Sequence, residues 1–484
     1  MIDELIGRVA EKKILTTSLA SQGAEFIAVV GRRRVGKTFL INQVYDKQIV
    51  FQITGIQNGK IKQQLRNFRD EFKSRINNPE RLPPPSDWLE AFQLLKEYLT
   101  PLMSPESKPV IFFDELPWLA GKKSDFLEAL GYFWNSWASR QNLVIVICGS
   151  AASWMIQNVV NNRGGLHNRL TKRIHLEPFT LDETERYLQS RQIHLDRYQI
   201  TQIYMAMGGI PHYLKEISSG QSAAQIINEL CFSKNGLLRD EFLRLYPSLF
   251  ANAVPHIAVI RALGKHRQGI TRQMLVETTN LPAGGSFTKL LEELTYSGFI
   301  STYRPFGSKK KEMLYRLTDE YSLFYLHFIE SNADEGGNIW KAISQTPAWY
   351  AWAGYAFENI CLKHIAQIKL ILGISGVVTQ TTSFYKKGTP EQPGAQIDLV
   401  IDRNDRIINL FEIKFYNETF TLTKDYAMQL RRKMSIFREH VKTNKHLSWA
   451  FITSFGLVHN QHSLGFIENI ITLDDLFAPT KTSH

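Results

Sequence analysis

The sequence predicts a multidomain protein that begins with one α/β domain and ends with another. Its 484 residues are too many for one compact core and suggest about three domains. The first third alternates apolar strands with helices, as expected for a parallel sheet. Residues 250–320 change to short helices and a strand pair, and the last third returns to helices and strands.

Composition restricts the class of protein further. The chain is 44% hydrophobic and 21% charged, which is typical of a globular protein. Its 3 cysteines are widely scattered, which indicates neither a disulfide framework nor a zinc site and fits a reducing compartment. The start, MIDELIGRVAEKK, lacks the apolar centre of a signal peptide. No apolar run approaches the length of a membrane span, so we expect a cytoplasmic protein with no membrane partner.

The net charge is +11 and the isoelectric point is about 9.3. This balance is compatible with a polyanionic partner such as DNA. Many soluble proteins are equally basic without touching nucleic acid, so the charge alone does not decide the partner.

A phosphate-binding turn follows the first strong strand. Residues 26–45, FIAVVGRRRVGKTFLINQVY, are an apolar strand, a turn and an amphipathic helix, and the turn matches G-x-x-x-x-G-K-[ST] at Gly31, Gly36, Lys37 and Thr38. The glycines let backbone N–H groups converge on phosphate oxygens at the start of the helix. Lys37 then reaches the β and γ phosphates, and Thr38 ligates Mg²⁺. We therefore expect ATP and Mg²⁺ as ligands, with Lys37 in both binding and catalysis.

Two further apolar strands end in polar residues. KPVIFFDELPWL (108–119) ends in Asp114 and Glu115. Asp114 is expected to hold Mg²⁺ through water, and Glu115 to polarise the attacking water. A strand end capped by two solvated acids is the weaker alternative, because the pair follows the phosphate loop at a suitable distance. LVIVICGSAAS (143–153) brings Ser150 to the same edge, either to sense the γ-phosphate or as a plain turn residue.

With a further strand at 48–55, this order of phosphate loop, acidic strand and polar-ended strand resembles the AAA+ and STAND group of ATPases. GGIPHYL (208–214) looks like the Gly-x-Pro element of STAND lids. The resemblance implies an arginine that reaches the phosphates, and NNRGGLHNRLTKR offers Arg163 and Arg169. Arg169 is our candidate; structural or surface roles for both arginines stay open.

The middle of the chain predicts three helices and a hairpin. The helices are HIAVIRALGKHRQGI, then a segment with Thr271 as its N-cap, then SFTKLLEELTYSG. The hairpin, residues 299–319, carries Lys309–Lys311 at its tip. This order resembles a winged-helix domain, which implies a third helix in the major groove and a wing on the DNA backbone. Glu292 and Glu293 in the third helix would repel phosphate, so a packing role stays open.

A second candidate site lies in the hairpin QIDLVIDRNDRIINLFEIKFYN (396–417). A loop of residues 404–406 would place Asp398 opposite Glu412, with the Cβ atoms about 4.5–5.5 Å apart, close enough for one cation between the carboxylates. Alternation puts Lys414 on the same face. The expected apolar face carries Ile397, Leu399, Phe411, Ile413 and Phe415. A salt-bridge cluster in which the lysine compensates the two acids is the alternative.

Together with Glu358 on a preceding aromatic-rich helix, this pattern resembles the PD-(D/E)XK nuclease superfamily. The resemblance implies that Glu358, Asp398 and Glu412 hold Mg²⁺, and that Glu412 and Lys414 are catalytic, with the lysine orienting or deprotonating the hydrolytic water. The sequence departs from the family pattern because Ile397 stands where a proline usually precedes the Asp. The basic helix KDYAMQLRRKM that follows either tracks a DNA backbone or is simply solvated.

We therefore expect four domains joined in series: an ATPase core at 1–178, a helical lid at 179–245, a winged helix at 246–330 and a nuclease-like domain at 339–484. The whole chain resembles a family of prokaryotic ATPases with a winged helix and a carboxyl-terminal PD-(D/E)XK-like domain. This resemblance implies an ATP-hydrolysing protein that acts on DNA through an Mg²⁺-dependent nuclease-like domain, and it is compatible with a homo-oligomer. The alternative is an ATP-dependent DNA-binding switch whose nuclease-like domain does not cleave.

Overall fold

A computed structural model describes most of the chain. The described residues are 5–76, 82–104, 106–121, 123–160, 168–307, 312–332, 339–389 and 393–479. The chain divides into two compact units: residues 1–178 with 291–298, and residues 179–290 with 299–484.

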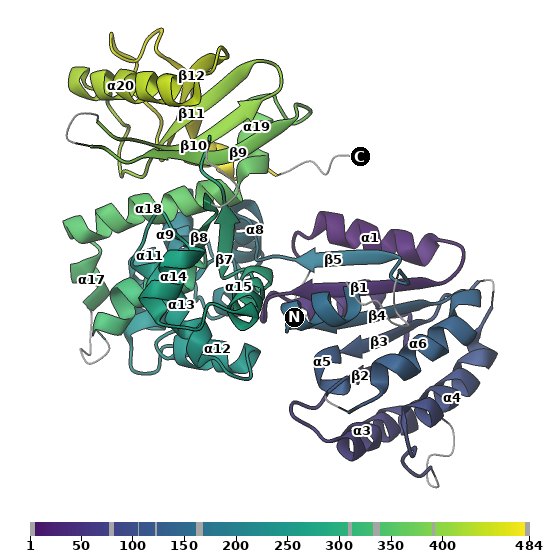
Figure 1. The fold of residues 1–484 in the computed structure, drawn as a ribbon. Helices are drawn as coiled ribbons and strands as arrows, with labels where there is room; N and C mark the ends of the chain where they lie inside the picture. The colour runs from purple at the N-terminus through teal and green to yellow at the C-terminus, as the bar shows by residue number, and fades with distance from the viewer. Residues whose placement is uncertain are drawn as a thin grey trace. The chain divides into compact units, whose positions relative to one another are not determined.

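The first unit is built on a five-stranded parallel sheet (Figure 1). Its strands are β1 (Glu25–Gly31), β2 (Ile49–Thr54), β3 (Val110–Asp114), β4 (Val144–Gly149) and β5 (Lys172–Leu176), in the order β2-β3-β4-β1-β5. The four strands expected from apolar runs are confirmed. The sequence analysis missed β5, because only Ile174 and Leu176 of this strand are buried and its other residues are polar.

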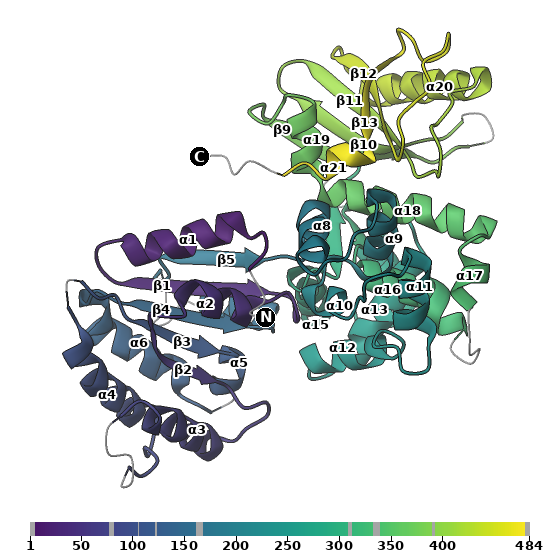
Figure 2. The ribbon, with the colours of Figure 1, turned by 180° about the vertical axis from the view of Figure 1, so that it is seen from behind.

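Helices cover both faces of this sheet. One face carries α3 (Ile61–Lys73), α4 (Trp88–Leu99) and α6 (Phe126–Ser136), whose buried residues share one core with the strands. Helices α1 (Val9–Ala20) and α2 (Lys37–Tyr45) pack against each other and against β5 and β1 (Figure 2). The short elements are η2 (Thr100–Leu102), α5 (Leu116–Leu119), η3 (Ala138–Arg140), α7 (Ala152–Met155) and η4 (Ile156–Val160).

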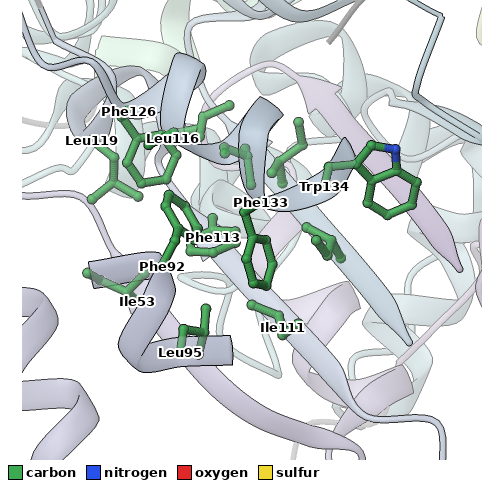
Figure 3. Packing of buried hydrophobic residues seen from close by; sticks show 14 of the residues in the cluster. Ile53, Phe92, Leu95, Ile111, Phe113, Leu116, Leu119, Phe126, Phe133 and Trp134 are labelled. Atoms are coloured by element: carbon green, nitrogen blue, oxygen red, sulfur yellow. The ribbon is translucent and has the colours of Figure 1, made fainter. Parts of the chain in front are cut away.

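An aromatic core fixes the middle of this sheet (Figure 3). Phe113 of β3 packs edge-on against Phe126 of α6 with ring centroids 5.6 Å apart, and Phe92 of α4 stacks on Phe133 at 5.1 Å. Each fully buried ring of this kind stabilises the fold by about 1.5–3 kcal/mol. Because Phe113 directly precedes Asp114, this packing fixes the end of β3 from which Asp114 and Glu115 project.

The second unit begins with helices, in the segment for which the sequence predicts a helical lid. They are α8 (Leu181–Ser190), α9 (Arg197–Met207), α10 (Pro211–Leu214), α11 (Ala223–Ile227), η5 (Asn228–Phe232) and α12 (Glu241–Leu249). In the GGIPHYL segment, Gly208 ends α9 with φ +67°. A Cβ added at Gly209 would lie 2.0 Å from the carbonyl oxygen of Phe179. Only glycine therefore permits this close approach of two backbones.

Three helices and a small sheet follow. The helices are α13 (Val254–Gly264), α14 (Arg272–Thr279) and α15 (Gly285–Tyr296), and the strands are β6 (Ile270–Thr271), β7 (Ile300–Tyr303) and β8 (Leu314–Leu317). The strands form an antiparallel sheet in the order β6-β8-β7. Thr271 caps α14 as predicted, since its hydroxyl oxygen accepts from the backbone N–H of Met274 at 3.3 Å. The predicted lysine tip at Lys309–Lys311 lies outside the described residues.

The carboxyl-terminal part contains a mixed five-stranded sheet, upper in Figure 1. Its strands are β9 (Thr379–Lys386), β10 (Ala395–Arg403), β11 (Ile407–Lys414), β12 (His446–Thr453) and β13 (Ile467–Thr472). The order is β13-β12-β11-β10-β9, with β9 to β11 antiparallel and β11 to β13 parallel. The accompanying helices are α16 (Glu320–Phe324), η7 (Tyr325–Ile329), η8 (Glu330–Asn332), α17 (Ile339–Ile343), α18 (Pro347–Lys363), α19 (Ile365–Ile371), α20 (Lys424–Val441) and α21 (Leu473–Leu476).

Helix α20 packs on this sheet, where Leu430 and Phe437 share a core with Val400, Leu410 and Trp449. Helix α18 contacts β11. Among the helices within the described ranges, none is both long and apolar enough to cross a membrane.

Candidate functional sites

The two glycines of the phosphate loop meet separate geometric requirements. Gly31 ends β1 with φ +156°, and a Cβ placed there would lie 2.3 Å from the carbonyl oxygen of Leu176. Gly36 precedes α2 in the left-handed conformation, with φ +92°. A side chain at Gly31 would collide with β5, and one at Gly36 would strain the backbone. The loop therefore needs glycine at both predicted positions.

The amine of Lys37 lies inside this loop. The side chain is buried, and Nζ donates hydrogen bonds to the carbonyl oxygens of Gly31 at 3.0 Å and Arg32 at 2.8 Å. Burial lowers the pKa of the lysine, although the acidic groups beside it oppose the shift. A buried ammonium held by neutral carbonyls is well suited to an anionic ligand, because charge pairing would then offset its desolvation. A nucleotide phosphate supplies that charge.

The predicted Mg²⁺ ligands come together at the end of β3. The Thr38 hydroxyl donates to Asp114 Oδ2 at 2.9 Å, and the Asp114 side chain is buried. A hydroxyl and a carboxylate side by side are the oxygen ligands that Mg²⁺ prefers, so these residues fit that cation. The backbone N–H of Glu115 donates to Asp114 Oδ1 at 2.9 Å and holds the carboxylate in place.

Sequence reasoning missed Cys148 as a partner of this acid. Its thiol donates to Asp114 Oδ1 at 2.7 Å, and burial raises the pKa of the thiol well above its usual range, which keeps it a donor. The register of the parallel sheet could have indicated this contact. Phe113 pairs with Ile147, so the next residues along the two strands, Asp114 and Cys148, lie side by side.

Glu115 is held by Ser150. The Ser150 hydroxyl donates to Glu115 Oε2 at 2.9 Å, and the Ser150 backbone N–H donates to the same oxygen at 3.2 Å. Glu115 also has a left-handed backbone with φ +49°, an uncommon conformation for a residue other than glycine and one that clusters at functional sites. The structure thus joins two predicted site residues through a direct contact that the sequence did not indicate.

The predicted phosphate-reaching arginine is not in contact with this group of residues. Arg169 lies exposed on the first unit, and its neighbour candidate Arg163 is outside the described residues. The role of Arg169 therefore stays a prediction.

Comparison with known protein families supports the interpretation of this site. Residues 5–217 match the model of the ATPase_2 family, described as an ATPase domain predominantly from Archaea. The matched segment includes the phosphate loop, Asp114, Glu115 and Ser150. Residues 5–217 are therefore similar to an ATPase domain, and they contain the phosphate-loop motif. The match covers less than half of the chain, so it leaves the segments after this ATPase domain unassigned.

Other similar proteins extend over more of the chain. An uncharacterized protein of Methanocaldococcus jannaschii is 22% identical over 442 residues, which are 89% of this chain and 92% of that protein. The Walker-type ATPase of Pyrococcus abyssi matches with a TM-score of 0.48 and 17% identity, over 67% of this chain and 99% of that one. The ORC2 protein of Aeropyrum pernix, solved in ADPNP–ADP complexes, matches with a TM-score of 0.42 and 14% identity, over 71% and 96%.

The second candidate site lies on the β10–β11 hairpin. Residues 404–406 form its loop, and Leu399 pairs with Phe411, so Asp398 lies level with Glu412 as the sequence predicted. Period-two alternation keeps Lys414 on the same side as Glu412. The register of the hairpin is therefore confirmed, and the contacts of its acids can be compared with the predicted metal site.

Glu412 is surrounded by donors. Its Oε1 accepts from Lys414 Nζ at 2.7 Å and from the Tyr426 hydroxyl, and its Oε2 accepts from Lys433 Nζ at 2.8 Å. Burial alone would raise the pKa of Glu412, but Lys414 and Lys433 outweigh it and the pKa falls. Burial likewise opposes the Lys414 charge, yet Glu412 raises the pKa of the amine. Buried Glu412 and half-buried Lys414 therefore form a charged pair on one face of the sheet.

Tyr426 and Lys433 come from α20, the helix that the sequence suggested would track DNA. They were missed as site residues. The signal was their spacing of seven residues, with Leu430 between them, because residues spaced by three or four positions share a face of a helix. Leu430 is buried against the sheet, so the same face carries Lys433 inward.

Asp398 has a different environment. Its Oδ2 accepts from the backbone N–H of Ile413 at 3.1 Å, and its Oδ1 accepts from Gln396 Nε2 at 3.5 Å. Burial, with the nearby charges of Glu412 and Glu358, raises the pKa of Asp398 to about 8. The donors to this acid are amides rather than cations. Its charge is therefore the one in the site that a bound cation would stabilise most.

Glu358 on α18 pairs with Arg316 of β8, with Nη2 and Oε2 3.5 Å apart. Burial raises the pKa of Glu358. Across the described ranges, no group of three or more His, Cys, Asp or Glu side chains gathers in a way that could hold a metal ion. The predicted set of Glu358, Asp398 and Glu412 is therefore not among such groups within the described residues, and its role in metal binding stays a prediction.

Proposed function

We propose that this protein binds and hydrolyses ATP. The observation that carries the proposal is the arrangement around Asp114, which accepts from Thr38 and is followed directly by Glu115. Lys37 would bind the β and γ phosphates, and Thr38 and Asp114 would hold Mg²⁺, which supplies charge stabilisation to the phosphoryl group. Glu115, oriented by Ser150, would accept a proton from the attacking water.

Phosphate release by the full chain tests this proposal. Lys37→Ala and Glu115→Gln should each lower turnover by about 100-fold or more, the range for loss of a group that acts on the reacting atoms. Lys47→Ala and Asp46→Asn alter exposed charges of the same domain and serve as matched controls with turnover near that of the unaltered protein. Turnover that survives both site variants would overturn the assignment.

We further propose that residues 246–330 are a winged helix and residues 339–484 a nuclease-like domain, and that the protein acts on DNA. The order α13, β6, α14, α15, β7, β8 supports the first part. The pairing of Asp398 with Glu412, and the contact between Glu412 and Lys414, support the second. When bound, Mg²⁺ would supply charge stabilisation for phosphodiester cleavage, with Asp398 and Glu412 as its holders and Lys414 as the group that orients water.

A specific observation favours the alternative, an ATP-dependent DNA-binding switch that does not cleave. Both oxygens of Glu412 already accept from cations, Lys414 and Lys433. Metal binding would require at least one of these contacts to break. A domain that only binds DNA would keep them.

A cleavage assay separates the two functions. The full chain is incubated with DNA, ATP and either Mg²⁺ or Mn²⁺, and compared with Lys414→Ala and with Lys341→Ala, which alters an exposed lysine of α17. A nuclease predicts cleavage that Lys414→Ala abolishes and Lys341→Ala retains. Binding without cleavage, unaffected by Asp398→Asn and Glu412→Gln, supports the switch. Equal cleavage by the unaltered protein and Lys414→Ala would rule out Lys414 as a catalytic residue.

A further inference from the structure

A cavity of about 440 Å³ opens beside Asp398 and Lys414 in the second unit. Its walls come from two parts of that unit. Strands β7 and β8 supply Tyr303 and Arg316, and the segment between α13 and β6 supplies Arg267 and Gln268. The other lining residues come from α18, the carboxyl-terminal sheet and the segment after β11. The candidate nuclease residues therefore do not face open solvent alone. They line one cavity together with side chains from the segment that we propose is a winged helix.

Arg316 is the most informative of these side chains. It is only 5% exposed, and its Nε and Nη2 atoms are buried without a hydrogen bond. The nearest acid, Glu358, lies at an ion-pair distance of 3.5 Å, longer than the 2.7–2.9 Å of a charge-assisted hydrogen bond. A buried guanidinium that lines a cavity and is held only by this long ion pair and by Tyr355 is suited to an anion with several acceptor oxygens, such as a phosphate.

A second arginine and a buried tyrosine lie beside it. The guanidinium carbon of Arg316 is 4.9 Å from the Tyr355 ring centroid, and that of Arg267 is 5.9 Å from it. The Tyr355 hydroxyl is also buried. The interior of the cavity thus holds three basic side chains, Arg267, Arg316 and Lys414, together with the acids Glu358 and Asp398.

The rim of the cavity is aromatic. Tyr350, Tyr385 and Tyr416 line it, and their exposed fractions are 44%, 48% and 43%. They come from α18, β9 and the segment after β11. Exposed aromatic side chains beside a basic groove are the usual surface for single-stranded nucleic acid, because bases stack on the rings while cations hold the backbone. Duplex DNA offers no such free base faces.

We propose that this cavity, the tyrosine pocket, takes an unpaired nucleotide of a single-stranded polynucleotide, with its base on the rim tyrosines and its phosphate at Arg316. The cavity volume lies within the range of about 300–1,000 Å³ that small ligands occupy. A paired base would first have to leave its stack, at an energetic cost, so the pocket favours strands that are already unpaired. This inference rests on the proposed action on nucleic acid and names the form of the substrate.

Binding of labelled oligonucleotides tests the proposal. The full chain is titrated in EDTA, which prevents metal-dependent cleavage, against a single strand of DNA, the same sequence as RNA, and the DNA duplex. The key variants are Arg267→Ala and the double variant Tyr385→Ala/Tyr416→Ala. Matched controls are Arg140→Ala and Tyr132→Ala, which alter exposed side chains of the first unit.

We expect single strands to bind more tightly than the duplex. The tyrosine variant should weaken single-strand binding by about tenfold or more, as expected for loss of base stacking, and should leave duplex binding within about twofold. A single strand carrying 2-aminopurine should lose fluorescence on binding the unaltered protein but not the tyrosine variant. Arg316→Lys keeps the charge of the buried site but not the guanidinium fork, so it should weaken single-strand binding while the melting temperature shows that the fold persists.

Each other outcome is decisive. Equal loss of duplex and single-strand binding, or unchanged single-strand binding in the tyrosine and arginine variants, would refute the pocket while leaving the proposed action on DNA intact. Competition by free thymidine monophosphate as effective as that of the oligonucleotide would assign the pocket to mononucleotides and refute a polynucleotide ligand. Absence of binding to every nucleic acid would remove the proposed function and this inference together.

Discussion

At the scale of single residues, the phosphate loop shows how one residue type serves two physical purposes. Gly31 is required for lack of space, because a Cβ there would collide with the carbonyl oxygen of Leu176 on the neighbouring strand β5. Gly36 is required by conformation alone, since nothing lies within 4 Å of the position that its Cβ would take. The motif specifies glycine at both positions, but it does not show that the physical reasons differ.

This difference predicts unequal costs of substitution. Gly36→Ala should destabilise the first unit by about 1–2 kcal/mol, the cost of a left-handed conformation for an L-residue. Gly31→Ala should cost more, because the new methyl group would lie 2.3 Å from a backbone oxygen and β1 or β5 would have to move. Denaturant unfolding of both variants measures the order. Gly121→Ala is the control, because a Cβ there would lie 3.6 Å from the Trp118 carbonyl oxygen, an ordinary van der Waals distance. A smaller loss of stability for Gly31→Ala than for Gly36→Ala would contradict this account.

The same scale shows what the sequence can and cannot specify about a site. The sequence could indicate the positions of Lys37 and Thr38 from short spacing along a strand, a turn and a helix, and those of Asp114 and Glu115 from the end of one apolar strand. The thiol of Cys148 was not predicted, because its contact with Asp114 depends on the register of two strands separated by about 30 residues of chain. Contacts of this kind exist only once the sheet is assembled.

At the scale of elements, the register of two strands joined by a short loop could be predicted from the sequence, whereas a β-bulge could not. The β10–β11 register followed from a three-residue loop, so Asp398 and Glu412 were paired correctly. Between Ile397 and Val400, however, the pairing of β10 with β9 shifts register. Ile397 consequently shares a core cluster with Val400, although strict alternation assigned Ile397 to the opposite face. A β-bulge adds one residue and reverses the alternation, and nothing in this sequence marked it.

Another element-level contact joins helices far apart in the chain. His364, at the end of α18, is buried; its Nε2 accepts from the backbone N–H of Leu181 at the start of α8, at 3.1 Å, and its Nδ1 lies 2.7 Å from the Ile360 carbonyl oxygen. This pattern fixes the proton on Nδ1. Burial lowers the pKa of the ring to about 4. Protonation of Nε2 would break the hydrogen bond that it accepts from the Leu181 N–H.

This contact predicts loss of stability in acid. Because the folded-state pKa of about 4 lies below the unfolded value of about 6.5, the unfolded chain binds more protons between these values. Stability is therefore full above pH 6.5 and falls as the pH drops toward 4. The melting temperature of the second unit should fall less steeply over this window in His364→Gln, which keeps an acceptor for Leu181 but does not titrate. His459→Gln, at an exposed histidine, should keep the slope of the unaltered protein; an equal slope in all three proteins would show that His364 does not titrate on unfolding.

At the scale of the whole molecule, the two candidate sites belong to different units of one chain. The family match ends at residue 217, within the helices that follow the ATPase sheet. Nothing in the composition predicted how a nucleotide at the first site would act on the second. The sequence predicts a serial order of modules, because each predicted module has its own periodicity and its own turns. Coupling between the two units would depend on the surfaces through which they contact each other, and the hydrophobic periodicity within one segment does not specify those surfaces.

Arg169 belongs to this largest scale. It is exposed on the first unit, so it would reach a bound nucleotide most simply on a second copy of the chain. We expect Arg169→Ala to lower ATP turnover by about tenfold or more, as for arginines that stabilise charge on the transferred phosphoryl group. Mixing Arg169→Ala with Lys37→Ala should restore part of the turnover, because one chain then supplies Lys37 and the other supplies Arg169. Mixing Lys37→Ala with Glu115→Gln is the control and should restore nothing, since both residues must act within one chain. Full turnover by Arg169→Ala alone would exclude the arginine from catalysis, and loss without recovery on mixing would place its action within its own chain.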